Sequence, residues 1–79
     1  MFPPAPGQRL NNGAITLAST AVQDDEAIVL AQWCGRYVTW HGHAAGHGAE
    51  PMYLSGEYGQ SLDDALDSYN RRVAATRLG

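Results

Sequence analysis

The chain has 79 residues, with eight acids and five bases, and a formal net charge of −3. This length allows one small domain and excludes a deep enzyme cleft, while the acidic balance excludes a general nucleic-acid binder, which needs many cationic contacts to phosphate. The only cysteine, Cys34, excludes an internal disulfide and a Cys-x-x-Cys pair, so a reducing compartment is favoured.

The acids are concentrated in the middle of the chain. All eight lie between Asp24 and Asp67, where the only base is Arg36, so this segment carries seven net negative charges. Such a segment favours docking against a basic surface. The alternative is a solvated acidic face that keeps a small protein in solution.

Residues 1–10 are expected to form a flexible, proline-rich arm, separate from a single domain at residues 11–79. The three prolines of the arm cannot continue a helix or a strand ladder, so it should be extended or disordered. The arm has no basic start followed by an apolar run, and no later stretch approaches the roughly 20 apolar residues of a membrane helix. We therefore expect a cytoplasmic protein that makes no membrane contact.

Four segments are expected to be strands. They are residues 14–21, 27–34, 37–41 and 52–58, chosen for their β-branched and aromatic side chains. Asn11-Asn12-Gly13 is a turn signal before the first strand, and Gly35-Arg36 matches a two-residue type II′ turn between the second and third. Gly56 is expected to weaken or bulge the fourth strand.

The last element is expected to be a helix over residues 62–77. Ser61 can cap its N-terminus with Asp64 at the third helical position. An apolar stripe at helical spacing follows, made of Leu62, Ala65, Leu66, Tyr69 and Val73. The fold class is therefore α+β: a four-stranded antiparallel meander (ββββα) with one C-terminal helix packed on one face.

Side-chain alternation divides the second and third strands between two faces. We expect the helix to cover the face that carries Val29, Ala31, Trp33, Val38 and Trp40. The opposite face collects Ile28, Leu30, Gln32, Cys34, Tyr37, Thr39 and His41. An uncovered patch of that size indicates an interface with a second copy or another protein. The alternative is that the arm folds back, with Phe2 and the prolines covering the patch.

The histidines raise the question of a metal site. His41, His43 and His47 lie among glycines, with Glu50 close behind, so three imidazoles and a carboxylate could in principle hold zinc. A glycine-rich loop, however, offers no partners to orient the rings and loses binding energy on ordering. We expect no metal and no other cofactor.

Nucleophilic catalysis has no support in the sequence. Cys34 lies at the end of an apolar strand, where burial would raise its pKa, and no serine has an elbow motif. We therefore expect no catalytic residue and a protein that is not an enzyme.

Several segments resemble a group of short proteins encoded by phages and mobile elements. They are Asn11-Asn12-Gly13-Ala14, Val29-Leu30-Ala31, Gly35-Arg36-Tyr37-Val38-Thr39-Trp40, Gly56-Glu57-Tyr58 and the helix from Leu62 to Arg72. The resemblance spans about residues 11–72. The function that it suggests is that of anti-CRISPR proteins, small inhibitors that bind a CRISPR effector (surveillance) complex and block its binding to target DNA.

The resemblance implies a non-catalytic inhibitor acting in the cytoplasm of a host cell. Its partner would be a host protein or ribonucleoprotein complex, with no direct contact to nucleic acid, and the protein would be a monomer or homodimer. The expected contact residues are the acids Asp24, Asp25, Glu26 and Glu57, with Ile28, Leu30, Tyr37 and His41 from the open sheet face. Two alternatives remain: a homodimeric accessory or regulatory protein of a phage or mobile element, and a zinc-binding protein that uses His41, His43 and His47.

Overall fold

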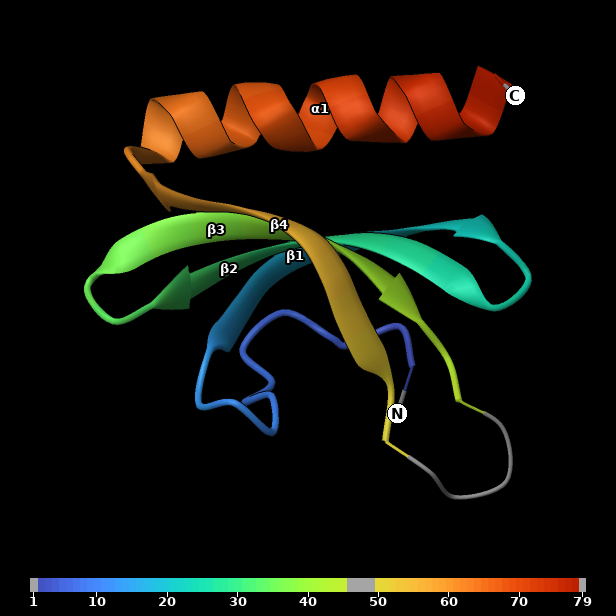
Figure 1. Cartoon of the computed structure of the whole chain (residues 1–79), viewed down its shortest axis with the longest axis horizontal. Helices are drawn as coiled ribbons and strands as arrows, with labels where there is room; N and C mark the ends of the chain where they lie inside the picture. Colours follow the sequence, from blue (N-terminus) through green and yellow to red (C-terminus); the bar gives the residue numbers. More distant parts are fainter. Residues whose placement is uncertain (1, 46–49, 79) are drawn as a thin grey trace.

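A computed structural model describes residues 2–45 and 50–78, with side chains as far as Thr76. Its elements are β1 (Ile15–Gln23), β2 (Glu26–Trp33), β3 (Arg36–His43), β4 (Met52–Gln60) and α1 (Leu62–Leu78). The strands form one antiparallel sheet in the order β1-β2-β3-β4, and α1 lies across one face of it (Figure 1). The α+β meander expected from the sequence is confirmed. No helix in the described part of the chain is long and apolar enough to cross a membrane.

The helix begins where the sequence indicates. The hydroxyl oxygen of Ser61 accepts a hydrogen bond from the backbone N–H of Asp64 at 3.2 Å, as an N-cap residue does. Asp63 and Asp64 lie in the first turn, where the helix dipole favours negative charge. A single residue separates the end of β4 from α1, so the chain turns back directly over the sheet.

The hairpin between β2 and β3 turns one residue earlier than expected. Its central residues are Cys34 (φ 53°) and Gly35 (φ 75°), and positive φ at both positions is the signature of a type I′ turn. Trp33 therefore pairs with Arg36, and Val29 pairs with Trp40. The predicted turn at Gly35-Arg36 is wrong, but the partners shift by two residues, so every side chain keeps its face. Cys34 is exposed in the turn.

The expected bulge in β4 is confirmed. Thr39 pairs with Glu57 and His41 pairs with Leu54, so β4 has one more residue than β3 between these pairs. Ser55, next to Gly56, takes a positive φ of 56° to accommodate it. The extra residue places Leu54 and Glu57 on the same face of the sheet, because both pair with residues of β3 that share a face.

The helix covers the opposite face from the one expected. Thr39, fully buried on the face of Ile28 and Leu30, hydrogen-bonds to Ser68 of α1 at 2.9 Å. Ala65 and Ser68 are fully buried, alone among the residues of α1 whose side chains are described, and such small side chains let a helix lie close to the sheet. The other face carries bulky indole rings, which would hold a helix farther from the sheet. This is why the helix packs on the face of Ile28 and Leu30.

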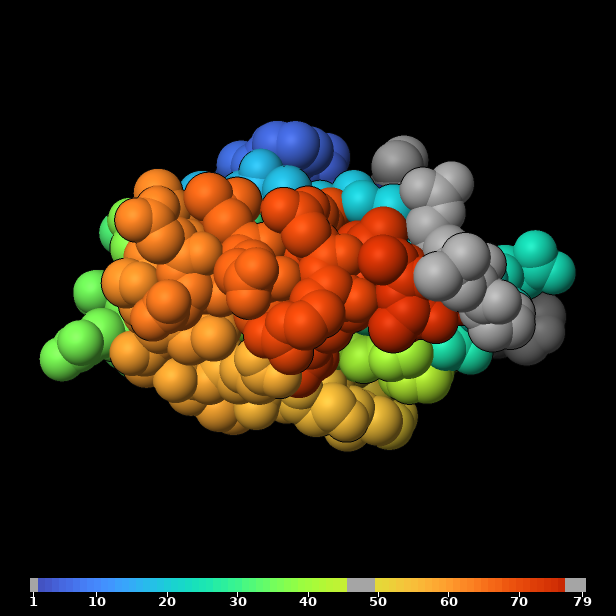
Figure 2. Space-filling model, turned by 90° about the horizontal axis from the view of Figure 1, so that it is seen from above, coloured from blue at the N-terminus to red at the C-terminus, as the bar shows by residue number. Residues whose placement is uncertain are grey.

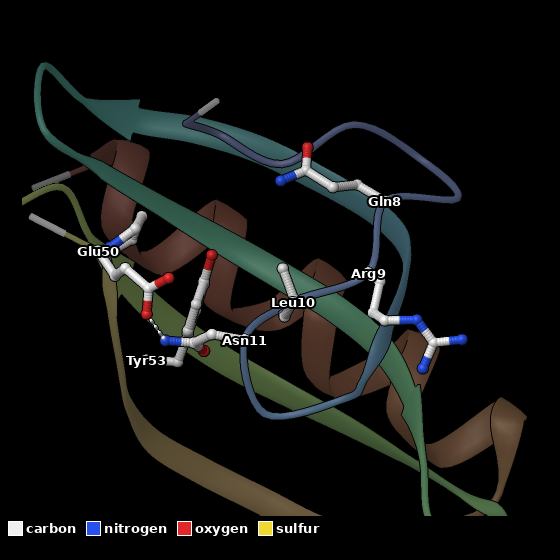
Figure 3. A pocket seen from close by; sticks show the side chains of 7 residues that line it. Gln8, Arg9, Leu10, Asn11, Glu50 and Tyr53 are labelled. Atoms are coloured by element: carbon white, nitrogen blue, oxygen red, sulfur yellow. Dashed lines mark hydrogen bonds between the residues drawn. The ribbon is translucent and has the colours of Figure 1, made fainter. Parts of the chain in front are cut away.

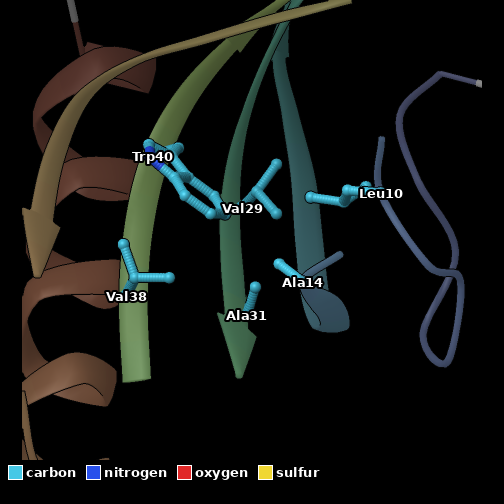
Figure 4. Close-up of a cluster of buried hydrophobic side chains, with 6 residues drawn as sticks. All are labelled: Leu10, Ala14, Val29, Ala31, Val38 and Trp40. Atoms are coloured by element: carbon cyan, nitrogen blue, oxygen red, sulfur yellow. The ribbon is translucent and has the colours of Figure 1, made fainter. Parts of the chain in front are cut away.

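The proline-rich arm covers the tryptophan face. Leu10 packs into a cluster of buried apolar side chains (Figure 4), which are Leu10, Ala14, Val29, Ala31, Val38 and Trp40. Backbone hydrogen bonds hold the arm to the start of β1: Gly7 donates to Thr16 at 2.7 Å, and Thr16 donates to Gln8 at 2.9 Å. Pro4 is also buried. The arm thus folds back over the sheet, as the alternative prediction stated, but it covers the tryptophan face and not the face of Ile28 and Leu30 (Figure 1).

β3 extends two residues past its expected end and includes a closely packed glycine. The strand was expected to end at His41 and continues to His43. A side chain at Gly42 would meet the rings of Phe2 and Tyr53 at 3.2 Å, so glycine permits these rings to cover the strand. Gly42 therefore belongs to the sheet, and not to the loop that follows.

Candidate functional site

Two of the expected apolar contact residues are unavailable to a partner. Ile28 and Leu30 are 1% and 2% exposed because α1 covers their face. Tyr37 is half-buried on the same face, close to the end of β4, where Gln60 is its strand partner. The expectation that these three side chains form an open patch in the monomer is wrong.

The four expected acids do not form one surface. Asp24 and Asp25 are exposed in the turn between β1 and β2. The carboxylate of Glu26, on β2, lies 2.6 Å from Nε2 of His41. Glu57 lies in β4 against the helix. Only the two aspartates of the turn therefore present their carboxylates outward as the docking hypothesis required.

Glu57 is held by a short chain of hydrogen bonds between sheet and helix. Ser68 donates its hydroxyl proton to Glu57 at 2.6 Å, and because this proton is used, Thr39 is the donor in the 2.9 Å bond to Ser68. Arg72 pairs with the other carboxylate oxygen of Glu57 at 3.2 Å. These two hydrogen bonds, from Ser68 first and Arg72 second, lower the pKa of Glu57.

The Glu57→Gln variant should therefore lose less stability in acid than the wild type. A carboxyl group whose pKa is lowered in the folded state stabilises the protein at pH values above its ordinary pKa. That stabilisation is lost as the pH falls through the lowered pKa. We expect the gap in stability between the two proteins, measured by urea unfolding, to narrow as the pH falls from about 5 through the lowered pKa of Glu57. The change should stay below about 1 kcal/mol, because the Glu57 side chain is 39% exposed.

Asp67→Asn is the matched control for that experiment. It removes the same charge from an exposed acid of α1, whose distance to Arg71 is 3.7 Å. If Asp67→Asn reduces the loss of stability in acid as much as Glu57→Gln does, the hydrogen bonds of Glu57 are not what lowers its pKa.

The most exposed large apolar side chains of the described residues lie along β4, on both faces of the sheet: Met52 and Leu54 on the helix face, and Tyr58 on the tryptophan face. Met52, Leu54 and Tyr58 are 53%, 45% and 57% exposed, and β4 is an edge strand of the sheet. In Figure 2, β4 forms a margin beside α1 that the helix leaves uncovered. The other edge strand, β1, is paired with the arm at its beginning. We call Met52, Leu54, Tyr58 and the outer backbone of β4 the β4 edge.

The sequence reasoning missed the β4 edge. The available signal was the position of the segment, because the last strand of a meander lies at the edge of the sheet. Large apolar residues in such a strand are candidates for a contact surface. The sequence-based prediction placed the apolar contact surface on the second and third strands, which a meander places in the centre of the sheet.

Glu26, His41 and His43 form the one group of potential metal ligands found in the described residues. Glu26 is the strand partner of His43, and the rings of His41 and His43 stack with centroids 4.7 Å apart. His41 lies in β3 as expected, whereas the expectation that His43 lies in a loop without orienting partners is wrong, because β3 continues to His43. His47 lies outside the described residues. Glu50 is elsewhere, bonded to Asn11 at 2.6 Å.

A pocket of about 360 Å³ lies between the arm and the start of β4 (Figure 3). Its lining residues are Gln8, Arg9, Leu10, Asn11, Glu50, Pro51 and Tyr53. Burial, and then the charge of Glu50, raises the pKa of Tyr53, so its phenol stays protonated at neutral pH. The pocket therefore offers one anchored carboxylate and one neutral hydroxyl, which suit hydrogen bonding to a polar group.

Comparison of this chain with protein-family models, with curated proteins and with solved structures found no match.

Proposed function

We propose that this protein is a non-catalytic binding protein that docks on a partner protein through the β4 edge. The observation that carries the proposal is an edge strand of nine residues with three large, exposed apolar side chains. Exposed edge strands are templates for pairing with another chain, and proteins that do not use them usually shorten, charge or cover them. β4 keeps nine residues and three large exposed apolar side chains, although it also carries Glu57 and the bulge beside Gly56, two features that can limit such pairing.

Strand addition is the binding mode that fits this edge. The partner contributes an extended segment whose backbone pairs with β4, while Met52, Leu54 and Tyr58 provide the apolar contacts that give specificity. The net charge of −3 and the exposed turn of Asp24 and Asp25 favour a basic partner, mainly through faster association.

The narrower form of the proposal is an anti-CRISPR protein that binds a CRISPR effector complex and blocks its binding to target DNA. Two features support it: the resemblance of residues 11–72 to small phage proteins, and an acidic balance suited to a groove that normally holds DNA. In this form Asp24 and Asp25 contact basic side chains of the effector, and the β4 edge supplies the apolar anchor.

A homodimer is the second candidate, and the same open edge favours it. Two copies related by a two-fold axis can pair their β4 strands antiparallel, so that the same residues meet on both sides. The product would be a continuous sheet of twice the width. The role would then be that of an accessory or regulatory protein of a phage or mobile element.

Leu54→Lys should weaken partner binding by at least about tenfold, because it places a charge in the centre of the proposed contact. The measurement is pull-down and titration against purified CRISPR surveillance complexes, followed by a competition assay with target DNA. Leu17→Lys is the matched control: Leu17 is 37% exposed on β1, the opposite edge strand. Light scattering on the wild type and both variants reports dimer formation.

Each outcome decides one part of the proposal. Binding that Leu54→Lys leaves intact would show that the β4 edge is not the contact surface. If no surveillance complex binds, the anti-CRISPR form is wrong. A dimer that Leu54→Lys dissociates, without effector binding, would identify the second candidate.

A further inference from the structure

We propose that Glu26, His41 and His43 form a binding site for a divalent transition metal of the zinc class. Each offers one ligand atom, and the three atoms lie within 4.8 Å of one another. Two ligand atoms on one tetrahedral zinc, bonded at about 2.0–2.1 Å, are roughly 3.3 Å apart. Small side-chain rotations therefore suffice to bring all three onto one ion.

The backbone places these ligands together before any ion binds. His41 and His43 are two residues apart on β3, so both rings project from the same face, where they stack within 10° of parallel. Glu26 lies directly across from His43 in the neighbouring strand. Beyond them, the N–H of Ala44 donates to the carbonyl oxygen of Asp25 at 2.8 Å and closes this end of the strand pair.

A site on two paired strands does not have the ordering cost of a site on a flexible loop. Ligands on a glycine-rich loop lose much of their binding energy to ordering, whereas β2 and β3 are already ordered by eight consecutive pairs. The side chains are also sheltered: those of His41 and Glu26 are 26% and 33% exposed. Partial burial strengthens the attraction between ion and carboxylate relative to open water.

The ligand chemistry selects the class of metal. Two imidazoles and one carboxylate suit zinc and its neighbours in the transition series, whereas magnesium and calcium prefer sites made entirely of oxygen atoms. Three protein ligands leave one coordination position for water or for a group from a partner. Cys34 is not a ligand, because it lies in the turn at the opposite end of the β2–β3 pair.

The three ligand atoms lie on β2 and β3 alone, so the metal site is independent of the β4 edge, and a failure of partner binding would leave zinc binding unchanged. If the metal is present, it joins the beginning of β2 to the end of β3 and should stabilise that end of the sheet.

The test is a zinc titration of the full chain, purified without a histidine tag and treated with EDTA. Calorimetry should show one zinc ion per chain, and His43→Gln and Glu26→Gln should each weaken binding by at least about 10- to 100-fold, the loss typical even for residues that only support a ligand. Cobalt(II) should bind with the same stoichiometry, and its absorption spectrum should lack the band of a cobalt–thiolate bond. Zinc should raise the melting temperature of the wild type, and EDTA should reverse the rise.

A matched control separates these three ligands from the other acids. Asp24→Asn removes an exposed carboxylate two residues from Glu26. This variant should bind zinc as the wild type does. Zinc binding without a defined stoichiometry, or an equal loss in this control, would overturn the assignment. Circular dichroism in EDTA confirms that each variant is folded.

Discussion

Trp40→Ala is expected to destabilise the protein by about 3–5 kcal/mol, the usual cost of truncating a buried tryptophan. The indole ring of Trp40 is 1% exposed and packs against Trp33, Tyr53 and Tyr58, with ring centroids 5.6–6.0 Å apart. Its N–H donates to the hydroxyl oxygen of Tyr58 at 3.0 Å, so the truncation also removes a hydrogen bond. A domain of this size has a total stability of only about 4–12 kcal/mol.

The measurement is urea unfolding followed by circular dichroism. We expect the variant to be largely unfolded at 37 °C or to have a much lower urea midpoint. Trp33→Ala is the matched comparison, because Trp33 is half-buried and hydrogen-bonds to the carbonyl oxygen of Asn12 at the rim of the same cluster. Equal losses in the two variants would contradict the placement of Trp40 at the centre of the arm-covered core.

Leu30→Ala is expected to cost about 2–5 kcal/mol, because Leu30 is 2% exposed beneath α1 and a cavity would remain there. Leu54→Ala, on the same face of the sheet but 45% exposed, should change stability by less than about 0.5 kcal/mol. The pair compares an identical truncation in two environments. Urea unfolding of both variants measures the difference directly.

This comparison distinguishes the two arrangements of the sheet. If the helix covered the tryptophan face, Leu30 would face water and its truncation would be nearly neutral. A small effect of Leu30→Ala, no larger than that of Leu54→Ala, would therefore overturn the fold described above. The expected result would confirm that Ile28 and Leu30 act in folding and not in partner binding.

The choice of face is where sequence reasoning failed, and the cause is visible in β2 and β3. Both faces of these central strands carry apolar residues: Val29 and Trp40 on one, Ile28 and Leu30 on the other. Alternation therefore separates the two sets but gives no sign of which one the helix covers. The small residues Ala65 and Ser68 in the helix were the better guide, because they fit a flat aliphatic face.

The sequence predicted part of the metal-ligand group and none of the β4 edge. The sequence placed His41 at the end of the third strand and His43 in the loop after it, whereas the longer β3 and the facing Glu26 emerged only from the strand register. That register depends on the turn at Cys34-Gly35, where two residues of positive φ fix which partners meet. The β4 edge depends on the position of a strand within the sheet, which local pattern does not reveal.

The sequence by itself determined the order of four strands and a helix, the cap at Ser61 and the bulge beside Gly56, because these features follow from local periodicity, turn chemistry and capping. Only the tertiary structure decided that α1 packs on Leu30, that the proline-rich arm covers Trp40, and that Glu26 meets the two histidines of β3. The reason is physical: these contacts join residues far apart in the chain, and packing volume and strand register select among arrangements that local pattern allows equally.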